Sequence, residues 1–341
     1  MRRRFLAWAA IPAAVIGAAL LTGAAVAAQG ALSGAKASVV RKAAAVQKTP
    51  WGDPDLQGIW TSSGSTPMER PTAYSGRENL TNEEVARLNK DDEARADLPP
   101  RAGDPGAYND FWFDRGRRTT QTSMVVDPVD GRFPPLTPAG AAARKSWRRG
   151  SDTWGDRHLW ERCITRGGMP NAMFPRAYNN NAQIFQTPGH VAILMEQIHE
   201  ARIVPLDGSP HPSDRVRQWM GDSRGHWEGD TLVIDTTNVA ERVTGLQPWA
   251  EFSSHEGSGV RLHIVERFRR GDRDTLEYTI TVDDPQMYTR PWTVRYPMTK
   301  TPALMYEYAC HEGNYGMAGI LAAGRAEAAA ASGEAGSRRP R

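Results

Sequence analysis

The chain has few cysteines and lacks the local motifs of several common enzyme classes. Its 341 residues include only Cys163 and Cys310, and neither lies in a CxxC or CxxCH pattern. Nothing therefore points to a zinc ribbon, a thioredoxin-like centre or a c-type haem. The sequence also lacks a GxSxG nucleophile elbow, a glycine-rich phosphate loop and a dinucleotide-binding fingerprint. We expect no cofactor, so any chemistry rests on side chains alone.

The chain has no net charge when its N-terminal arginines are left out. The chain has 42 Lys and Arg against 39 Asp and Glu, and Arg2, Arg3 and Arg4 account for the whole difference. More basic residues lie before residue 51 and after residue 331, so acidic residues outnumber basic ones between these positions. Binding of nucleic acid or of an anionic membrane surface needs a basic face. We expect neither partner, and a small-molecule ligand or substrate instead.

A long apolar run occurs only near the N-terminus. Three arginines precede the apolar residues 5–21, and small residues follow up to Ala28. This order predicts a secretory signal peptide over 1–28 and a periplasmic or secreted protein. The letters RRRFL also resemble the twin-arginine export consensus, and a Sec signal with three arginines fits equally well. No second apolar run reaches the roughly 18 residues that cross a bilayer, so we expect no stable membrane span after signal cleavage.

The predicted compartment suggests a role for the two cysteines. Disulfides form and persist in oxidising compartments, so we expect one bridge between Cys163 and Cys310. In the chain-entropy model, closing so long a loop stabilises the fold by roughly 5 kcal/mol at most. The bridge would tie the middle of the domain to its C-terminal end.

Composition divides the rest of the chain into three parts. Residues 29–50 are small and basic and show no apolar periodicity, which predicts a linker. Residues 51–331 are long enough for one β-rich domain with a sizeable core. An Ala-rich stretch at 318–331 predicts a short helix, and the polar residues 332–341 predict a disordered tail.

Strand signals dominate within the domain, because β-branched and aliphatic runs are bounded by glycine and proline. They predict strands at 57–61, 122–126, 183–186, 190–195, 201–206, 225–227, 231–235, 262–268, 275–282 and 292–296. Thr81 and Glu84 form a capping box for a helix to about Ala96, and Pro138 opens a second helix to about Arg148. Strands joined by short turns indicate a mainly β, antiparallel fold that closes on itself to hide its edges.

Two resemblances support this fold class. The letters LQGIW at 56–60 resemble the Gly-x-Trp signature that opens lipocalin-like (calycin) barrels, in which the tryptophan plugs one end. This resemblance implies an antiparallel β-barrel-like (lipocalin-like) domain with a helical insertion at about 70–160, in the first third.

The second resemblance covers most of the chain after residue 50 and is to a family of exported bacterial proteins of unassigned function. It implies export and a shared fold, without an activity to transfer. The matching blocks are PDLQGIW, SMVVDPVDGRFPPLTP, ERCITRGGMP, YNNNAQIFQTPGHVAIL, IHEARIVPLDG, RQWMGDSRGHWEGDTLVIDTTN, TITVDDPQMYTRPWTV and YEYACHEGNYGM.

Two polar segments are candidates for catalysis. His311 and Glu312 follow the last strand signals, and a histidine beside a carboxylate can act as a general acid or base. Asp222 and Arg224 lie on a predicted loop, where an arginine fork could clamp a polar substrate group. The structural alternative is that the first pair caps the barrel and the second braces its loop.

Further polar residues are candidates for substrate binding. Three consecutive amides beside a tyrosine suit sugar or polyol hydroxyls, although asparagine also forms turns. The predicted substrate-binding residues are Tyr178, Asn179, Asn180, Asn181, His199, Trp227, Asn314 and Tyr315.

Metal binding is not expected. Glu196, His199 and Glu200 match no known ligand spacing, and the other histidines are no better placed. Positive charge at Arg162, Arg166 and Arg176 suggests solvated faces or structural ion pairs.

Together these signals favour an exported, cofactor-independent enzyme that performs acid–base chemistry of the lyase, hydratase or hydrolase type on a small organic molecule. Polar blocks at strand ends suggest that a barrel mouth gathers them into one pocket. One alternative is a non-catalytic carrier of an apolar ligand, with a cavity lined by residues such as Trp60 and Trp292. A second alternative is a structural envelope protein with a filled core.

Overall fold

The computed structural model describes residues 47–96, 114, 116–146, 152–176, 178–240 and 261–337. The predicted signal peptide and most of the predicted linker lie outside these ranges. Among the described residues, no helix has the length and apolar character of a membrane-spanning segment.

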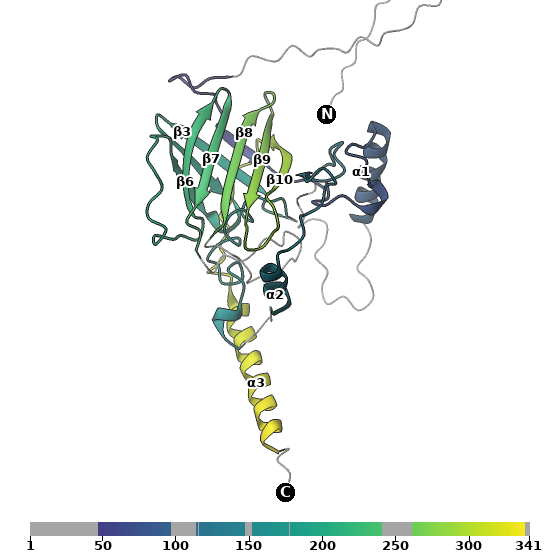
Figure 1. The fold of residues 1–341 in the computed structure, drawn as a ribbon, viewed down its shortest axis with the longest axis vertical. Coiled ribbons are helices and arrows are strands. Elements are labelled where there is room, and N and C mark those ends of the chain that lie inside the picture. The colour runs from purple at the N-terminus through teal and green to yellow at the C-terminus, as the bar shows by residue number, and fades with distance from the viewer. Residues whose placement is uncertain are drawn as a thin grey trace, which may run out of the picture. The chain divides into compact units, whose positions relative to one another are not determined.

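Ten strands form one sheet in which every pairing is antiparallel (Figure 1). They are β1 Gly58–Thr61, β2 Val125–Asp127, β3 Asn181–Thr187, β4 His190–Met195, β5 Ala201–Pro205, β6 Asp222–Glu228, β7 Thr231–Thr237, β8 His263–Arg270, β9 Thr275–Asp283 and β10 Trp292–Lys300. Nine of them follow the order β5-β4-β3-β1-β10-β9-β8-β7-β6, and β2 pairs with β10. The predicted mainly antiparallel β fold is confirmed.

The two outermost strands of this order, β5 and β6, come close enough to bring the sheet almost into a closed barrel. A Cβ atom added to Gly225 of β6 would lie 2.6 Å from Leu206 Cδ2 and 2.9 Å from Val204 Cγ1. Only a residue without a side chain leaves room for this approach.

One end of the barrel is closed around a buried tryptophan. Trp60 of β1 is fully buried, and its indole Nε1 donates a hydrogen bond to the Leu56 carbonyl at 2.9 Å. The Arg270 guanidinium lies 5.4 Å from the centre of the Trp60 ring and donates to the Asp55 carbonyl at 2.6 Å. Because Arg270 ends β8, this closure lies at the end of the barrel where β8 finishes.

Residues 163–176 pack into the core near the end where β10 begins. Phe174 stacks on Trp292, with ring centres 6.2 Å apart, and the Tyr296 hydroxyl donates to the Met173 carbonyl at 2.5 Å. The predicted disulfide is confirmed, since Cys163 is bonded to Cys310. It attaches this segment to the turn that precedes the C-terminal helix.

The longer helices are α1 Asn82–Ala96, α2 Pro138–Ser146 and α3 Tyr315–Ser337, and short 3₁₀ turns lie at η1 Thr72–Tyr74, η3 Trp154–Asp156 and η4 Gln197–His199. The capping box is present: the Glu84 N–H donates to Thr81 Oγ1 at 3.2 Å, and the Thr81 N–H donates to Glu84 Oε2 at 2.8 Å. The predicted end of the second helix, at about Arg148, lies outside the described residues.

Two elements differ from the ranges expected from the sequence. Helix α3 ends at Ser337, beyond the expected helix end at residue 331, and residues 338–341 of the predicted tail lie outside the described ranges. Strand β6 begins at Asp222, so Asp222 and Arg224 lie in a strand and not on a loop. Pairing with β7 imposes the extended conformation on residues of weak β propensity.

Candidate functional site

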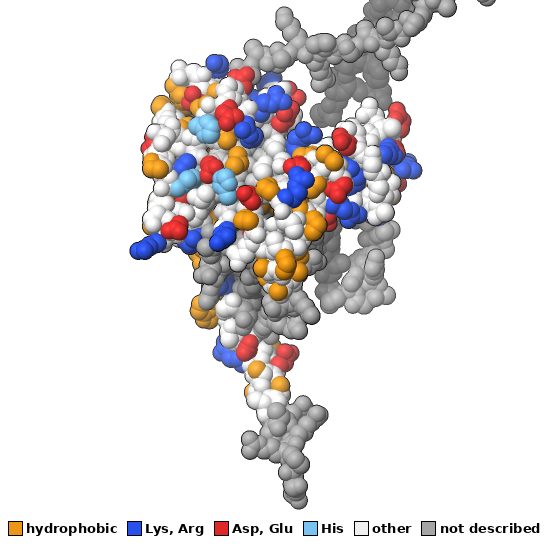
Figure 2. All heavy atoms as spheres, in the orientation of Figure 1, with side chains coloured by type: hydrophobic (Ala, Val, Ile, Leu, Met, Phe, Trp, Pro, Cys, Tyr) orange, Lys and Arg blue, Asp and Glu red, His pale blue; other side chains and the backbone are white. Residues whose placement is uncertain are grey.

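A row of ionisable side chains crosses the outer face of three neighbouring strands. Alternation along β6 buries Ser223 and Gly225 and turns Asp222 and Arg224 outward. Asp235 of β7 and His263 of β8 lie on the same outer face, at half-buried positions flanked by buried ones. Figure 2 shows histidine and acidic side chains gathered over β6, β7 and β8.

Two histidines share one carboxylate in this row. Asp235 Oδ2 lies 2.7 Å from His263 Nε2, and Asp235 Oδ1 lies 3.0 Å from His211 Nε2. The second ring nitrogen of His211, Nδ1, lies 2.7 Å from Asp222 Oδ1. His211 comes from the segment between β5 and β6, so a loop residue bridges carboxylates on two strands.

Arg224 completes the row by binding the second carboxylate with two parallel hydrogen bonds from one edge of its fork. Its Nε donates to Asp222 Oδ1 at 2.8 Å and its Nη2 donates to Asp222 Oδ2 at 3.0 Å. Its Nη1 donates to Ser209 Oγ at 2.6 Å. We call His263, Asp235, His211, Asp222 and Arg224 the His–Asp network.

Solvent exposure changes along the His–Asp network. The His263 side chain is 42% exposed, whereas the Asp222 side chain is 13% exposed. His263 is therefore the member of the network with the most exposed side chain, and Asp222 is the member with the least exposed one.

Hydrogen bonds and burial shift the pKa values of His263, Asp235 and Asp222. The hydrogen bond to Asp235 raises the pKa of His263, and partial burial of the ring opposes this shift. Burial raises the pKa of Asp235, but the hydrogen bonds from His263 and His211 outweigh burial and leave this pKa below its usual value. The pKa of Asp222 is lowered in the same way, with burial outweighed by Arg224 and His211. The carboxylates are thus ionised at neutral pH.

Sequence reasoning singled out only Asp222 and Arg224 of this network. His211 and His263 are among the histidines whose spacing fits no metal site, and the sequence analysis names no role for Asp235. Period-two alternation places Asp235 and His263 on the outer faces of their strands. Their contact also depends on register, because Asp235 pairs with Val265 and Thr236 pairs with Ile264.

The predicted catalytic residues His311 and Glu312 are not part of the His–Asp network. His311 and Glu312 are exposed in the turn next to the disulfide, and within the described ranges no hydrogen bond or ion pair joins their side chains to Asp222 or Arg224. Their proton-transfer role stays a prediction. In the same turn, Asn314 Nδ2 donates to the Glu161 carbonyl at 2.8 Å, which braces the disulfide. Tyr315 begins α3 and is exposed.

The remaining predicted residues lie in two other places. Asn181 begins β3, and Asn180 just before it is buried, where its Oδ1 accepts from the Arg176 N–H at 2.6 Å. Tyr178 and Asn179 precede them, and His199 Nδ1 lies 3.1 Å from the Tyr308 carbonyl oxygen. By contrast, Trp227 of β6 packs against the hydrophobic core, on the opposite face from Arg224.

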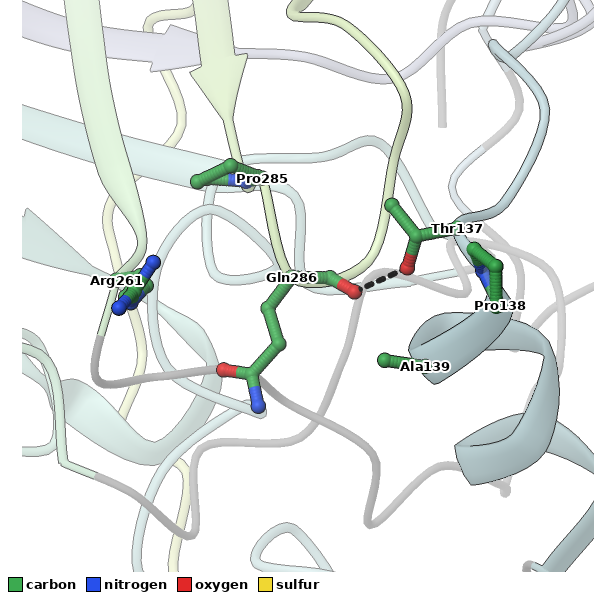
Figure 3. A pocket seen from close by; sticks show the side chains of 6 residues that line it. All are labelled: Thr137, Pro138, Ala139, Arg261, Pro285 and Gln286. Carbon is green, nitrogen blue, oxygen red and sulfur yellow. Dashed lines mark hydrogen bonds between the residues drawn. The ribbon is translucent and has the colours of Figure 1, made fainter.

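A separate surface hollow, of about 620 Å³, lies beside α2 (Figure 3). One of its walls is held by the Thr137 hydroxyl, which donates to the Gln286 carbonyl at 2.5 Å. None of the predicted site residues lines it. The lining residues are Thr137, Pro138, Ala139, Arg261, Pro285 and Gln286.

The described ranges contain no group of three or more His, Cys, Asp or Glu residues placed to hold a metal ion. Comparison of the chain with models of protein families, with curated proteins and with solved structures finds no match. The structure itself defines a class: a disulfide-bonded, mainly antiparallel domain whose sheet is almost closed into a barrel. On its outer face hydrogen bonds link the five ionisable side chains of the His–Asp network, of which sequence reasoning found two.

Proposed function

We propose that the protein is an exported enzyme that performs general acid–base chemistry on a small organic molecule without a cofactor, and that the His–Asp network is its reactive centre. The observation that carries this proposal is the contact between the half-exposed His263 and Asp235, at 2.7 Å. A histidine oriented by a carboxylate is suited to proton transfer near neutral pH.

The contact assigns different tasks to the two ring nitrogens of His263. Because Nε2–H donates to Asp235, Nδ1 is the atom that faces a substrate and accepts its proton. Positive charge then develops on the ring beside the Asp235 carboxylate, which stabilises it. The same Nδ1 returns the proton to the leaving group or to the product, so the enzyme ends in its starting state.

His211, Asp222 and Arg224 are positioning residues in this scheme. His211 binds Asp235 on the oxygen that His263 leaves free, which fixes the carboxylate in the plane needed to orient His263. Arg224 is itself fixed by Ser209 and holds Asp222 against His211. Rigid support of this kind keeps a proton-transfer group in its productive orientation.

The barrel interior favours an enzyme over a carrier of an apolar ligand. Trp60, Trp292 and Leu232 are fully buried in the packed core. The interior also holds an ion pair, in which Arg202 Nη1 donates to Glu266 Oε2 at 2.6 Å. A structural envelope protein would fit a filled core, but it has no need of a histidine polarised by a carboxylate.

The test is a comparison of variants in a panel of simple reactions. We would measure hydrolysis of nitrophenyl esters and lactones, and dehydration of small hydroxy acids, by the wild-type protein and by His263→Gln. Loss of general acid–base catalysis lowers kcat/KM by roughly 10²- to 10⁴-fold. The matched control is His226→Gln, since His226 is an exposed histidine of β6 whose contact is Glu228, outside the network.

The pH profile separates a catalytic from a structural role. We expect kcat/KM to rise with pH through a value above the ordinary imidazole pKa, because His263 acts as a base and its pKa is raised. Asp235→Asn should shift this limb to lower pH. Activity that survives His263→Gln but disappears in His311→Ala would move the reactive centre to the turn at His311 and reject the proposal.

A further inference from the structure

The described structure contains a buried arginine without an acidic partner. Arg166 lies in the segment 163–176 that packs into the core, and it is 2% exposed. Among the described residues, no carboxylate forms an ion pair with its guanidinium group. This corrects the expectation of a solvated or ion-paired side chain at this position.

The contacts of Arg166 are few, long and neutral. Its Nη2 donates to Asn180 Oδ1 at 3.3 Å, and its Nη1 donates to the Ala172 carbonyl at 3.5 Å. Its Nε has no hydrogen-bond partner. One edge of the fork, formed by Nε and the second proton of Nη2, is therefore unsatisfied.

The nearby acidic side chains are committed to other donors. Glu200 accepts a hydrogen bond from the Thr165 hydroxyl at 2.6 Å. Asp114 accepts from the Asn180 N–H at 3.0 Å. The positive charge at Arg166 is therefore without a counter-ion among the described residues.

Burial of this charge is unfavourable in the absence of an anion. A guanidinium group keeps its proton under physiological conditions, and an unpaired charge in the interior loses its hydration without compensation. Burial lowers the pKa of Arg166 well below its usual value, and the positive charge of Arg176 lowers it further. Both effects would be relieved by a bound negative charge.

Three tyrosines act electrostatically on Arg166. The phenol groups of Tyr178, Tyr296 and Tyr308 oppose the lowering of its pKa, and Tyr178 and Tyr308 are half-buried. Tyr296 is buried, and its hydroxyl is bonded to the Met173 carbonyl. Asn179 precedes Asn180 with a φ of 53°, a left-handed conformation that asparagine adopts more readily than most residues.

We infer that Arg166 is the binding group for a small carboxylate, which binds at the unsatisfied Nε–Nη2 edge of the guanidinium fork. A carboxylate matches this edge with two parallel hydrogen bonds, whereas chloride cannot. Met173 and Phe174 follow Ala172 in the chain and are buried, and an apolar environment of this kind favours a singly charged ion over phosphate. The predicted substrate-binding residues Tyr178 and Asn180 would then belong to this site.

The test is carboxylate binding to the full mature protein. We would titrate sodium acetate and sodium benzoate against sodium chloride and sodium phosphate at equal ionic strength, and follow Tm and the heat of binding. The carboxylates should raise Tm in a saturable way, and Arg166→Met should abolish this rise. The control Arg267→Met removes an exposed arginine of β8 whose partner is Glu228, and it should keep the full response.

Two further variants keep the outcome decisive. Arg166→Met should fold and be at least as stable as the wild-type protein without carboxylate, because it removes an unpaired buried charge. Arg166→Lys keeps the charge but loses the fork, and its apparent affinity should fall at least tenfold. An equal response to chloride, or a wild-type protein that ignores both carboxylates, would overturn the inference.

This inference is independent of the proposed acid–base function. Carboxylate binding is measured without turnover, and His263→Gln should bind as the wild-type protein does. Binding that is lost only in the Arg166 variants, with no reaction detected, would retain the site and reject the catalytic proposal. Turnover that depends on His263, with no carboxylate response, would do the reverse.

Discussion

Glu266 and Asp235 lie on neighbouring strands of one sheet but face opposite sides of it. Ile234 of β7 pairs with Glu266 of β8, and Asp235 pairs with Val265, so the two carboxylates differ by one step along the ladder. That single step moves a side chain from the barrel interior to the outer face.

The interior carboxylate is held by donors that do not change. Glu266 is fully buried and accepts two hydrogen bonds from Arg202, at 2.6 and 2.9 Å, and one from the Tyr278 hydroxyl at 2.7 Å. Burial raises the pKa of Tyr278 well above its usual value, so its proton stays in place. Because all three bonds persist over the ordinary pH range, this group acts as a structural element.

The exterior carboxylate is held by a donor that titrates. Asp235 is 36% exposed, and the pKa of its partner His263 is raised from the ordinary imidazole value by their hydrogen bond. A carboxylate on the inner face is thus a fixed part of the core, whereas a carboxylate on the outer face has hydrogen bonds that depend on pH. Access to water and the identity of the donors make the difference.

Glu266→Gln should produce the largest effect, because it leaves the buried Arg202 without a counter-ion. Breaking a buried pair in this way costs about 3–5 kcal/mol of unfolding free energy. Urea denaturation measures the loss. A decrease below about 1 kcal/mol would show that the interior pair is as dispensable as a surface pair.

Tyr278→Phe should have an intermediate effect. The substitution removes one hydrogen bond to a buried carboxylate, which is worth about 1.5–3 kcal/mol. In the Glu266→Gln background the cost of Tyr278→Phe should shrink, since the two residues share one network. Equal costs in both backgrounds would mean that the hydroxyl acts through packing and not through Glu266.

The His–Asp network should contribute less than about 1 kcal/mol to the pH dependence of stability, because its groups are partly exposed. The lowered pKa values of Asp235 and Asp222 contribute stability that is lost as pH falls through these values. The raised pKa of His263 contributes stability below about pH 6.5 that is lost as pH rises through its folded value. We therefore expect this contribution to peak between about pH 4 and 6.5.

Urea midpoints measured from pH 3.5 to 8.5 would show this maximum. Asp235→Asn should flatten it, whereas His226→Gln should leave it in place. A maximum that persists in Asp235→Asn would assign the pH dependence to other groups.

Salt should have the smallest effect and should act on one face only. The coupling free energy between Asp235 and His263, measured by a double-mutant cycle, should fall by a few tenths of a kcal/mol between 0.05 and 1 M NaCl. The coupling between Arg202 and Glu266 should not change, because buried pairs are screened much less. Equal salt dependence of the two coupling free energies would mean that the pairs on the two faces are screened alike.

Local signals were sufficient for much of the fold. Period-two alternation and turn residues identified strands at 190–195 and 275–282 close to the observed β4 and β9. The capping box located the start of α1, and the expected redox compartment paired Cys163 with Cys310. These features depend on neighbouring residues or, for the disulfide, on the count of cysteines.

Less of the candidate site could be predicted from the sequence. Asp222 and Arg224 were found as a pair because they are close in sequence, but His211, Asp235 and His263 join them only through the pairing of β6, β7 and β8. The buried position of Arg166 was missed for a related reason. Charge in a sequence suggests exposure, whereas the disulfide-linked segment 163–176 places Arg166 in the core.

The sequence by itself determined the antiparallel strands, their alternation and the disulfide, since each follows from local propensity or from residue type. Only the tertiary structure decided which ionisable groups share a hydrogen bond and which are removed from water. Register sets these contacts across strands that are far apart in the chain. Burial then determines whether a charged group belongs to the core, as at Glu266 and Arg166, or stays in contact with solvent, as at Asp235.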